Sequence, residues 1–266
     1  MTRMDLAQQM RAALERDELR LLFQPVLRLQ SNRFAGAEAL LRWQHPSRGL
    51  LTPDKFLDIA EDTGLIVPIG EWVIDQACGE LRRWQDAHTG PEQLGVAVNL
   101  SGRQFGPALV AVVASAIERH GIDPSTLTLE ITEGLINGDG PAANETVRAL
   151  KDLGVWLAID DFGTGHSSLG RLREYDFDEL KIDRQFVSDL DTGDPTLVIA
   201  QIAMAHGLGL NVVAEGVETV AELEYLRAEG CDQAQGYLIA RPLAADDVRS
   251  LLAGPGEWLA ASAPAA

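Results

Sequence analysis

The sequence has little cysteine, little positive charge and no long apolar run. Its two cysteines, Cys78 and Cys231, lie far apart in 266 residues, so they show no metal-ligand spacing and are expected to be buried free thiols of a reducing compartment. No run approaches the roughly 18 apolar residues of a membrane span. Residues 1–20 are polar and lack the apolar core of a signal peptide. We therefore expect a cytoplasmic chain with no membrane partner.

Basic residues are scarce relative to acidic ones. Lys and Arg number 22 against 40 Asp and Glu, which gives a formal net charge of −18. Nonspecific binding to a nucleic-acid polymer or to an anionic membrane needs a basic face, so both are excluded. An anionic small-molecule substrate is still compatible with this charge, provided that metal ions or a few well-placed basic residues bind it.

The chain shows no internal repeat, no low-complexity block and no linker that would divide it. With 46% hydrophobic residues, it has ample material for one large core. We expect residues 1–253 to form a single domain and residues 254–266 to form a flexible C-terminal tail.

Short β-rich segments alternate with helical patterns, which predicts βα units around a parallel sheet. Eight strands and helices between most of them predict a TIM-like (βα)8 barrel of class α/β. Only residues 30–33 separate the first two strands, too few for a parallel crossover, so the first strand should run antiparallel to the rest. The expected strands are residues 21–29, 34–43, 95–100, 126–131, 155–160, 179–182, 210–214 and 233–237, and the expected helices include residues 107–120, 142–153, 195–206 and 220–229.

The most informative motif is the carboxylate pair Asp160-Asp161, which ends an apolar strand and precedes the turn Gly163-Thr164-Gly165. Taken alone, the pair is more typical of an ordinary turn after a strand. Neighbouring carboxylates repel each other, however, and divalent cations are the usual compensation because hard cations take oxygen ligands. Other strands of this chain end in the same way, which favours the metal hypothesis.

The strand ends carry seven polar side chains from six different strands. Because the C-terminal ends of barrel strands meet at one mouth, these side chains are expected to converge. Each has an ordinary alternative by itself, such as a solvated lysine, but five buried carboxylates without partners would cost many kcal/mol. All-oxygen ligands favour Mg²⁺ or Mn²⁺ over Zn²⁺. The seven are Glu38, Asn99, Glu130, Asp160, Asp161, Lys181 and Glu215.

Two such cations, about 4 Å apart, suit an in-line displacement at phosphorus by an activated water. Lys181 would lie beside that water as a positive charge. Arg42 follows Glu38 by four residues and shares its strand face, so it suits a phosphate oxygen, although a surface arginine is an equally good interpretation.

The segment Glu38-Ala39-Leu40-Leu41-Arg42-Trp43 resembles the signature of the bacterial EAL-domain phosphodiesterases. Seven further segments, from Phe23-Gln24-Pro25 to Ala234-Gln235-Gly236-Tyr237, extend the resemblance over residues 19–252. It implies a barrel that hydrolyses cyclic di-GMP to linear pGpG with two Mg²⁺ or Mn²⁺ ions and works as a homodimer. We expect Ca²⁺ to inhibit, because its looser coordination would displace the attacking water. Regulatory domains would lie outside this sequence.

The resemblance also implies roles for single residues. The catalytic set is Lys181 with Glu38 and Glu215, and the metal ligands are Glu38, Asn99, Glu130, Asp160, Asp161, Asp183 and Glu215, of which Asp161 and Asp183 serve the second metal. The substrate side holds Gln24, Arg42 and Gln235, and the loop after the fifth strand is supported by Glu133, Gly163 and Gly165. The alternative is a catalytically silent module that binds cyclic di-GMP or a protein partner. An unrelated Mg²⁺-dependent enolate-forming barrel would leave the multi-segment resemblance unexplained.

Overall fold

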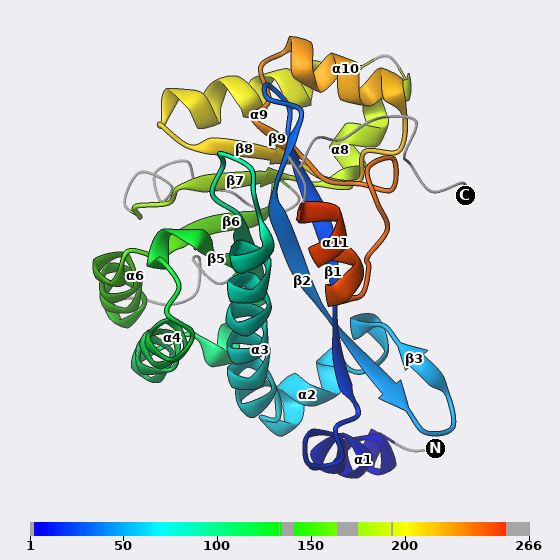
Figure 1. The fold of residues 1–266 in the computed structure, drawn as a ribbon, viewed down its shortest axis with the longest axis vertical. Coiled ribbons are helices and arrows are strands. Elements are labelled where there is room, and N and C mark those ends of the chain that lie inside the picture. Colours follow the sequence, from blue (N-terminus) through cyan, green and yellow to red (C-terminus); the bar gives the residue numbers. More distant parts are fainter. Residues whose placement is uncertain (1–2, 133, 135–140, 164–174, 193, 254–266) are drawn as a thin grey trace.

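A computed structural model describes residues 3–132, 134, 141–163, 175–192 and 194–253 (Figure 1). Eight strands close into a barrel in the order β1-β9-β8-β7-β6-β5-β4-β2, and β2 pairs with β1 to complete the ring. A ninth strand, β3, extends β2 outside the barrel. The strands are β1 Leu19–Arg28, β2 Arg33–His45, β3 Gly49–Leu51, β4 Gly95–Leu100, β5 Leu127–Thr132, β6 Trp156–Phe162, β7 Glu179–Ile182, β8 Asn211–Ala214 and β9 Gln233–Ala234.

Helices surround the barrel and follow its parallel strands (Figure 1). Local sequence sets their ends: α4 begins at Pro107 and stops at Gly121 in the left-handed region, and Thr219 and Glu222 form a capping box on α10. The α-helices are α1 Arg3–Glu15, α2 Leu57–Thr63, α3 Ile66–Ala87, α4 Pro107–His120, α6 Pro141–Leu153, α8 Arg184–Ser188, α9 Thr196–Gly207, α10 Val220–Ala228 and α11 Ala245–Leu252; short 3-10 turns are η1 Pro53–Lys55, η2 Gly102–Gln104, η3 Pro124–Thr126 and η4 Asp189–Thr192.

The predicted barrel and its reversed first strand are confirmed. β1 is antiparallel to both of its neighbours, β2 and β9, whereas β2 and β4 are parallel. The predicted last strand is too long, since β9 ends at Ala234. Two residues later, Gly236 lies so close to the Val217 backbone that a Cβ atom would overlap it, so only glycine fits there.

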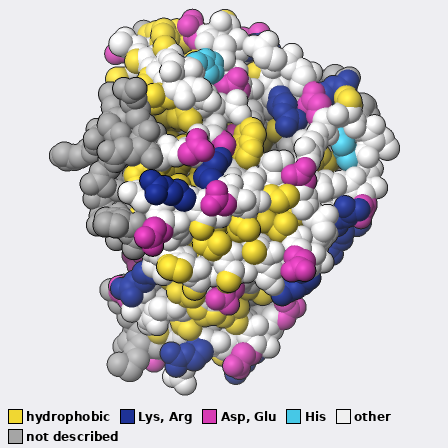
Figure 2. Space-filling view, turned by 90° about the vertical axis from the view of Figure 1, so that its left-hand side faces the viewer, with side chains coloured by type: hydrophobic (Ala, Val, Ile, Leu, Met, Phe, Trp, Pro, Cys, Tyr) yellow, Lys and Arg dark blue, Asp and Glu magenta, His cyan; other side chains and the backbone are white. Residues whose placement is uncertain are grey.

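The surface and the two thiols agree with the composition. On the face shown in Figure 2, Lys and Arg side chains lie singly or in small groups among Asp and Glu. Both cysteines are buried and free, and burial raises the pKa of each thiol to about 12. Among the described helices, none is both long and apolar enough to cross a bilayer.

The barrel interior carries a buried acid, Glu179, at the start of β7, with 7% of its surface exposed. Among the described residues, one hydrogen bond reaches its carboxylate, from Gln233 Nε2 to Oε2 at 3.3 Å. Burial in the barrel raises the pKa of Glu179 from 4.5 to about 7. The folded chain therefore binds this proton more tightly than the unfolded chain, and stability falls as pH rises from 4.5 through 7.

The substitution Glu179→Gln is expected to remove this penalty. The variant should gain up to about 3 kcal/mol over the wild type at pH 8 and little at pH 4.5, because each pKa unit is worth about 1.4 kcal/mol. Urea unfolding at both pH values measures the difference. Glu224→Gln, at a side chain 61% exposed on α10, serves as the control, and equal pH dependence in Glu179→Gln and wild type would contradict the expectation.

Candidate active site

The ammonium of Lys181 lies at the centre of a buried acidic cluster at the C-terminal mouth of the barrel. Its Nζ atom is 2.6 Å from Glu215 Oε1 and 2.7 Å from Glu130 Oε1. Glu38 Oε2 and Asp160 Oδ1 follow at 3.6 and 3.7 Å. The Lys181 side chain is only 2% exposed. β7 therefore delivers one positive charge among four carboxylates from β2, β5, β6 and the end of β8.

Two carboxamides fix the carboxylate of Glu38. Asn99 Nδ2 donates to Oε1 and Gln235 Nε2 donates to Oε2, each at 2.6 Å. Gln235 Nε2 also reaches Gln24 Oε1 at 3.2 Å, and Gln24 Nε2 donates to the Ala240 carbonyl. Burial alone would raise the pKa of Glu38, but the Lys181 ammonium and these hydrogen bonds lower it. Glu38 is therefore held rigidly in its ionised form.

The cluster has more negative charge than Lys181 neutralises. Burial, together with the neighbouring charge of Glu38, raises the pKa of Glu130 well above its ordinary value. Burial likewise raises the pKa of Glu215 to about 7, against the lowering effect of Lys181. Glu130 Oε2 is buried and has no hydrogen-bond partner among the described residues. An additional cation at this place would relieve both the charge and the unpaired oxygen.

Asp161 and Asp183 form a second acidic group beside Asp160. Asp161 has φ 55°, in the left-handed region that few residues other than Gly, Asn and Asp adopt. Burial, followed by the charges of Asp160 and Asp183, raises its pKa. Asp183 caps α8 through a hydrogen bond from the Gln185 amide to Oδ1 at 2.8 Å. Oδ1 of Asp183 thus accepts a hydrogen bond from the start of α8, and Oδ2 can interact with the other acidic residues of this group.

A cavity of about 260 Å³ opens above the cluster. Tyr237 lines it with 46% of its surface exposed, and the Arg241 guanidinium covers one ring face at 4.3 Å from the centroid. Arg184 and Glu218 form an ion pair of 3.3 Å at the rim. Arg42 donates Nη1 to the Leu41 carbonyl, and burial lowers its pKa. A flat aromatic surface therefore borders the charged cluster.

The carboxylate and amide oxygens of the cluster suit a hard divalent cation, although the Lys181 ammonium lies between them. Within the described ranges, no three His, Cys, Asp or Glu side chains form a group that could hold a metal ion as they stand. Lys181 occupies the space between four of the carboxylates. Mg²⁺ and Mn²⁺ prefer carboxylate and amide oxygens as ligands, and Glu130 Oε2 receives no hydrogen bond from the part of the chain that the structure describes. Loading a metal would require the ammonium to shift.

Comparison with known proteins places this site in a family. A family model described as "EAL domain" matches residues 7–242. The chain belongs to the EAL domain family. It is 46% identical over 253 residues to the bifunctional diguanylate cyclase/cyclic di-GMP phosphodiesterase MucR of Pseudomonas aeruginosa, covering 94% of this chain and 37% of that protein. It is 44% identical over 243 residues to the cyclic di-GMP phosphodiesterase NbdA of the same organism, covering 90% and 31%.

The EAL fold is also the fold of solved relatives. A structure described as the PaMucR phosphodiesterase in complex with c-di-GMP superposes with a TM-score of 0.86 at 46% identity, over 92% of this chain and 99% of that one. The chain spans only about a third of the length of the curated relatives above. Their activities as whole proteins are therefore matters for proposal here.

The EAL barrel brings most of the predicted site residues together. Contacts join Glu38, Asn99, Glu130, Asp160, Lys181, Glu215, Gln24 and Gln235 into one network. Gly163 has φ +89°, a conformation that glycine adopts without strain. Glu133 and Gly165 lie outside the described residues, as does the tail 254–266, and their predicted roles stay predictions. The sequence alone did not predict site roles for Tyr237, Arg241, Arg184 or Glu218.

Proposed function

We propose that the chain is a metal-dependent phosphodiesterase that hydrolyses cyclic di-GMP to linear pGpG. The observation that carries this proposal is the buried convergence of Lys181 with four carboxylates at the barrel mouth. Membership of the EAL domain family and the similarity to MucR and NbdA support the substrate. A chain that only bound the nucleotide would have no use for a complete acidic cluster.

Each site residue has a definite place in the proposed reaction. Two Mg²⁺ or Mn²⁺ ions, when bound, would supply an activated water and charge stabilisation at phosphorus. The first ion would be held by Glu38, Asn99, Glu130, Asp160 and Glu215, and the second by Asp161 and Asp183. Asn99 and Gln235 orient Glu38, so its oxygens need little rearrangement.

The chain itself provides positive charge and a surface for the substrate. The Lys181 ammonium, displaced a short way from its present partners, would stabilise the charge that develops on the phosphoryl oxygens. Arg42 would bind a non-reacting phosphate oxygen. The free face of Tyr237, whose other face is covered by Arg241, would stack on a guanine base.

Removal of the metal is expected to abolish hydrolysis. With EDTA the purified chain should produce no pGpG, and Mg²⁺ or Mn²⁺ should restore turnover. Ca²⁺ should not, because its higher and looser coordination does not fix an attacking water. Chromatographic separation of products after incubation with cyclic di-GMP measures this. Full turnover in Ca²⁺ would contradict the two-metal geometry, and binding without turnover in either metal would favour a silent binding module.

The biological setting is likewise a proposal. Buried free thiols support a cytoplasmic location. The greater length of MucR and NbdA supports regulatory domains outside this sequence. A homodimer would cover α9, which exposes Leu197 and Ile199 at 53% and 37%, and light scattering would give the mass that decides it.

A further inference from the structure

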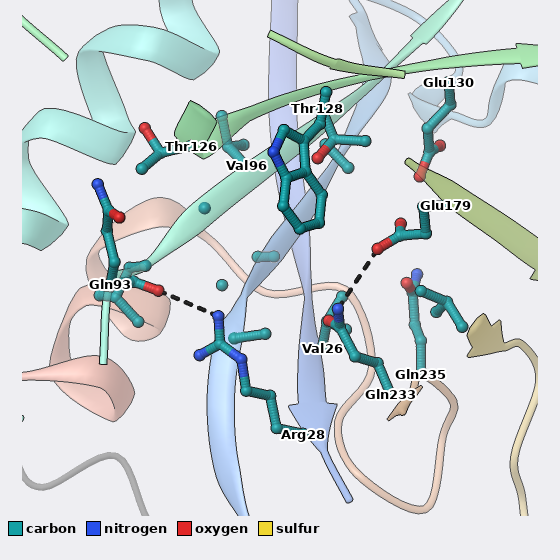
Figure 3. Close-up of a pocket in the computed structure, with 18 of the residues that line it drawn as sticks. Val26, Arg28, Gln93, Val96, Thr126, Thr128, Glu130, Glu179, Gln233 and Gln235 are labelled. Atoms are coloured by element: carbon teal, nitrogen blue, oxygen red, sulfur yellow. Dashed lines mark hydrogen bonds between the residues drawn. The ribbon is translucent and has the colours of Figure 1, made fainter. Parts of the chain in front are cut away.

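A second cavity, of about 180 Å³, lies inside the barrel at the opposite end from the mouth (Figure 3). It is lined where the parallel strands begin, by residues such as Thr126, Thr128 and Glu179, and by Arg28 at the end of the reversed β1. Lys181 and Gln235 line both this cavity and the mouth cavity. The space is therefore on the barrel axis, directly beneath the acidic cluster, and is separate from the proposed substrate site.

Small residues on β2 and β4 create this space. Branched aliphatic side chains usually fill a barrel of this type. Here β2 and β4 contribute Ala35, Gly36, Ala37, Gly95 and Ala97 to the lining. A Cβ atom at Gly36 would overlap the Gly95 carbonyl, so the two backbones approach too closely for a side chain there. The small residues of β2 and β4 therefore leave this end of the barrel interior unfilled by side chains.

The cavity is rich in hydrogen-bond acceptors that have no donor. Glu179 has one hydrogen bond, from Gln233 Nε2 to Oε2, and no ion pair with any described residue. Figure 3 shows the Glu179 carboxylate and the Gln233 side chain facing each other inside the cavity. Gln233 and Gln235 each use Nε2 as a donor, which leaves both Oε1 atoms as acceptors without a partner among the described residues. A buried carboxylate in such a place calls for a donor-rich cation.

The basic residues that line the cavity are already engaged. Arg28 Nη1 is 3.0 Å from Glu92 Oε2, and its Nη2 donates to the Gln93 carbonyl at 3.3 Å. Lys181 is surrounded by four carboxylates. Neither ammonium nor guanidinium is within ion-pair distance of Glu179. The local charge balance therefore leaves Glu179 available to an added cation.

We infer that this cavity binds a small planar organic cation of the guanidinium or amidinium type, held by Glu179 and Gln233 beside the indole of Trp156. Two parallel N–H groups of such a cation match a carboxylate in a bidentate way. The indole of Trp156 lines the same cavity and offers a surface on which planar cations are stabilised. The space is large enough for a group of this size.

Titration of the whole chain with methylguanidinium chloride tests this inference. We expect a saturable shift of the Trp156 indole N–H signal in ¹H–¹⁵N spectra, assigned with Trp156→Phe, below about 10 mM ligand. Glu179→Gln keeps the shape of the side chain and removes its charge, so it should weaken binding at least about tenfold. Glu224→Gln, on exposed α10, should bind as the wild type does.

Two further probes separate charge from shape. Urea has the same planar form without charge, and tetramethylammonium has charge without N–H donors; neither should saturate the signal over the same range. A signal that does not saturate with methylguanidinium, equal affinity in Glu179→Gln, or equal binding of urea would overturn the inference and leave a cavity filled by water. A folded ¹H–¹⁵N spectrum of Glu179→Gln would show that any weaker binding is not caused by unfolding.

Discussion

Replacement of Lys181 by methionine is expected to abolish hydrolysis and to destabilise the metal-free chain by about 3–5 kcal/mol. Methionine keeps much of the volume and removes the charge. Four carboxylates that now contact the ammonium would then face one another in a buried place without a cation. Removing one partner from a buried ionic group costs far more than removing an exposed ion pair, because the remaining charges cannot be hydrated.

Chemical unfolding in EDTA and in Mg²⁺ measures this effect, together with the assay for pGpG. Added Mg²⁺ should recover most of the lost stability in Lys181→Met, since the cation takes over the charge balance, but it should not recover activity. Lys151→Met is the matched control, because Lys151 pairs with a single half-buried carboxylate, Asp178, at 2.6 Å. That variant should lose about 1 kcal/mol and stay active. Wild-type stability of Lys181→Met in EDTA would contradict our description of the cluster.

Replacement of Glu38 by alanine is expected to reduce hydrolysis at saturating Mg²⁺ by at least about 1000-fold. Glu38 accepts hydrogen bonds from Asn99 and Gln235 at 2.6 Å on separate oxygens, so its loss removes a proposed metal ligand and leaves two buried donors without acceptors. The Asn99 amide, which we place among the ligands, would lose its orientation at the same time.

Two measurements distinguish loss of the ligand from general unfolding. Calorimetric titration with Mn²⁺ should show weaker metal binding in Glu38→Ala, and circular dichroism should show an intact barrel. Glu224→Ala, exposed on α10, provides the control that should behave as the wild type in both. Retained turnover in Glu38→Ala at saturating metal would remove Glu38 from the site and with it the proposed mechanism.

The barrel was predictable because its signals are local. Apolar strands that alternate with helices, and a four-residue connection between the first two strands, suffice to predict the closed sheet and the reversed β1. The hairpin to β3 and the early end of β9 were not predictable in this way. β3 pairs locally with the end of β2, but its three residues are mostly exposed and give no apolar alternation. Around the end of β9, distant segments meet, as in the approach of Gly236 to Val217, and such contacts leave no periodic pattern in the sequence.

The site was predictable in its composition but not in its arrangement. Strand-end carboxylates could be assigned to one mouth, since parallel strands end together. Their distances to Lys181 depend on register and on how β7 lies beside β6, where the pairing shifts. Tyr237 could have been suspected as an aromatic residue two positions after Gln235. The cavity around Glu179 was not predicted from the sequence, because a lone acidic residue at the start of a strand is usually solvated.

Because Lys181 lies within the acidic cluster, folding of this chain does not depend on a bound metal ion. Many metalloproteins stay unfolded until their ion arrives, because ligand carboxylates or thiolates repel one another in its absence. Here the Lys181 ammonium already balances much of that charge inside the polypeptide. A newly synthesised chain can therefore fold before a metal binds. Under the proposed mechanism, metal supply would govern how active the molecules are and not how many of them survive.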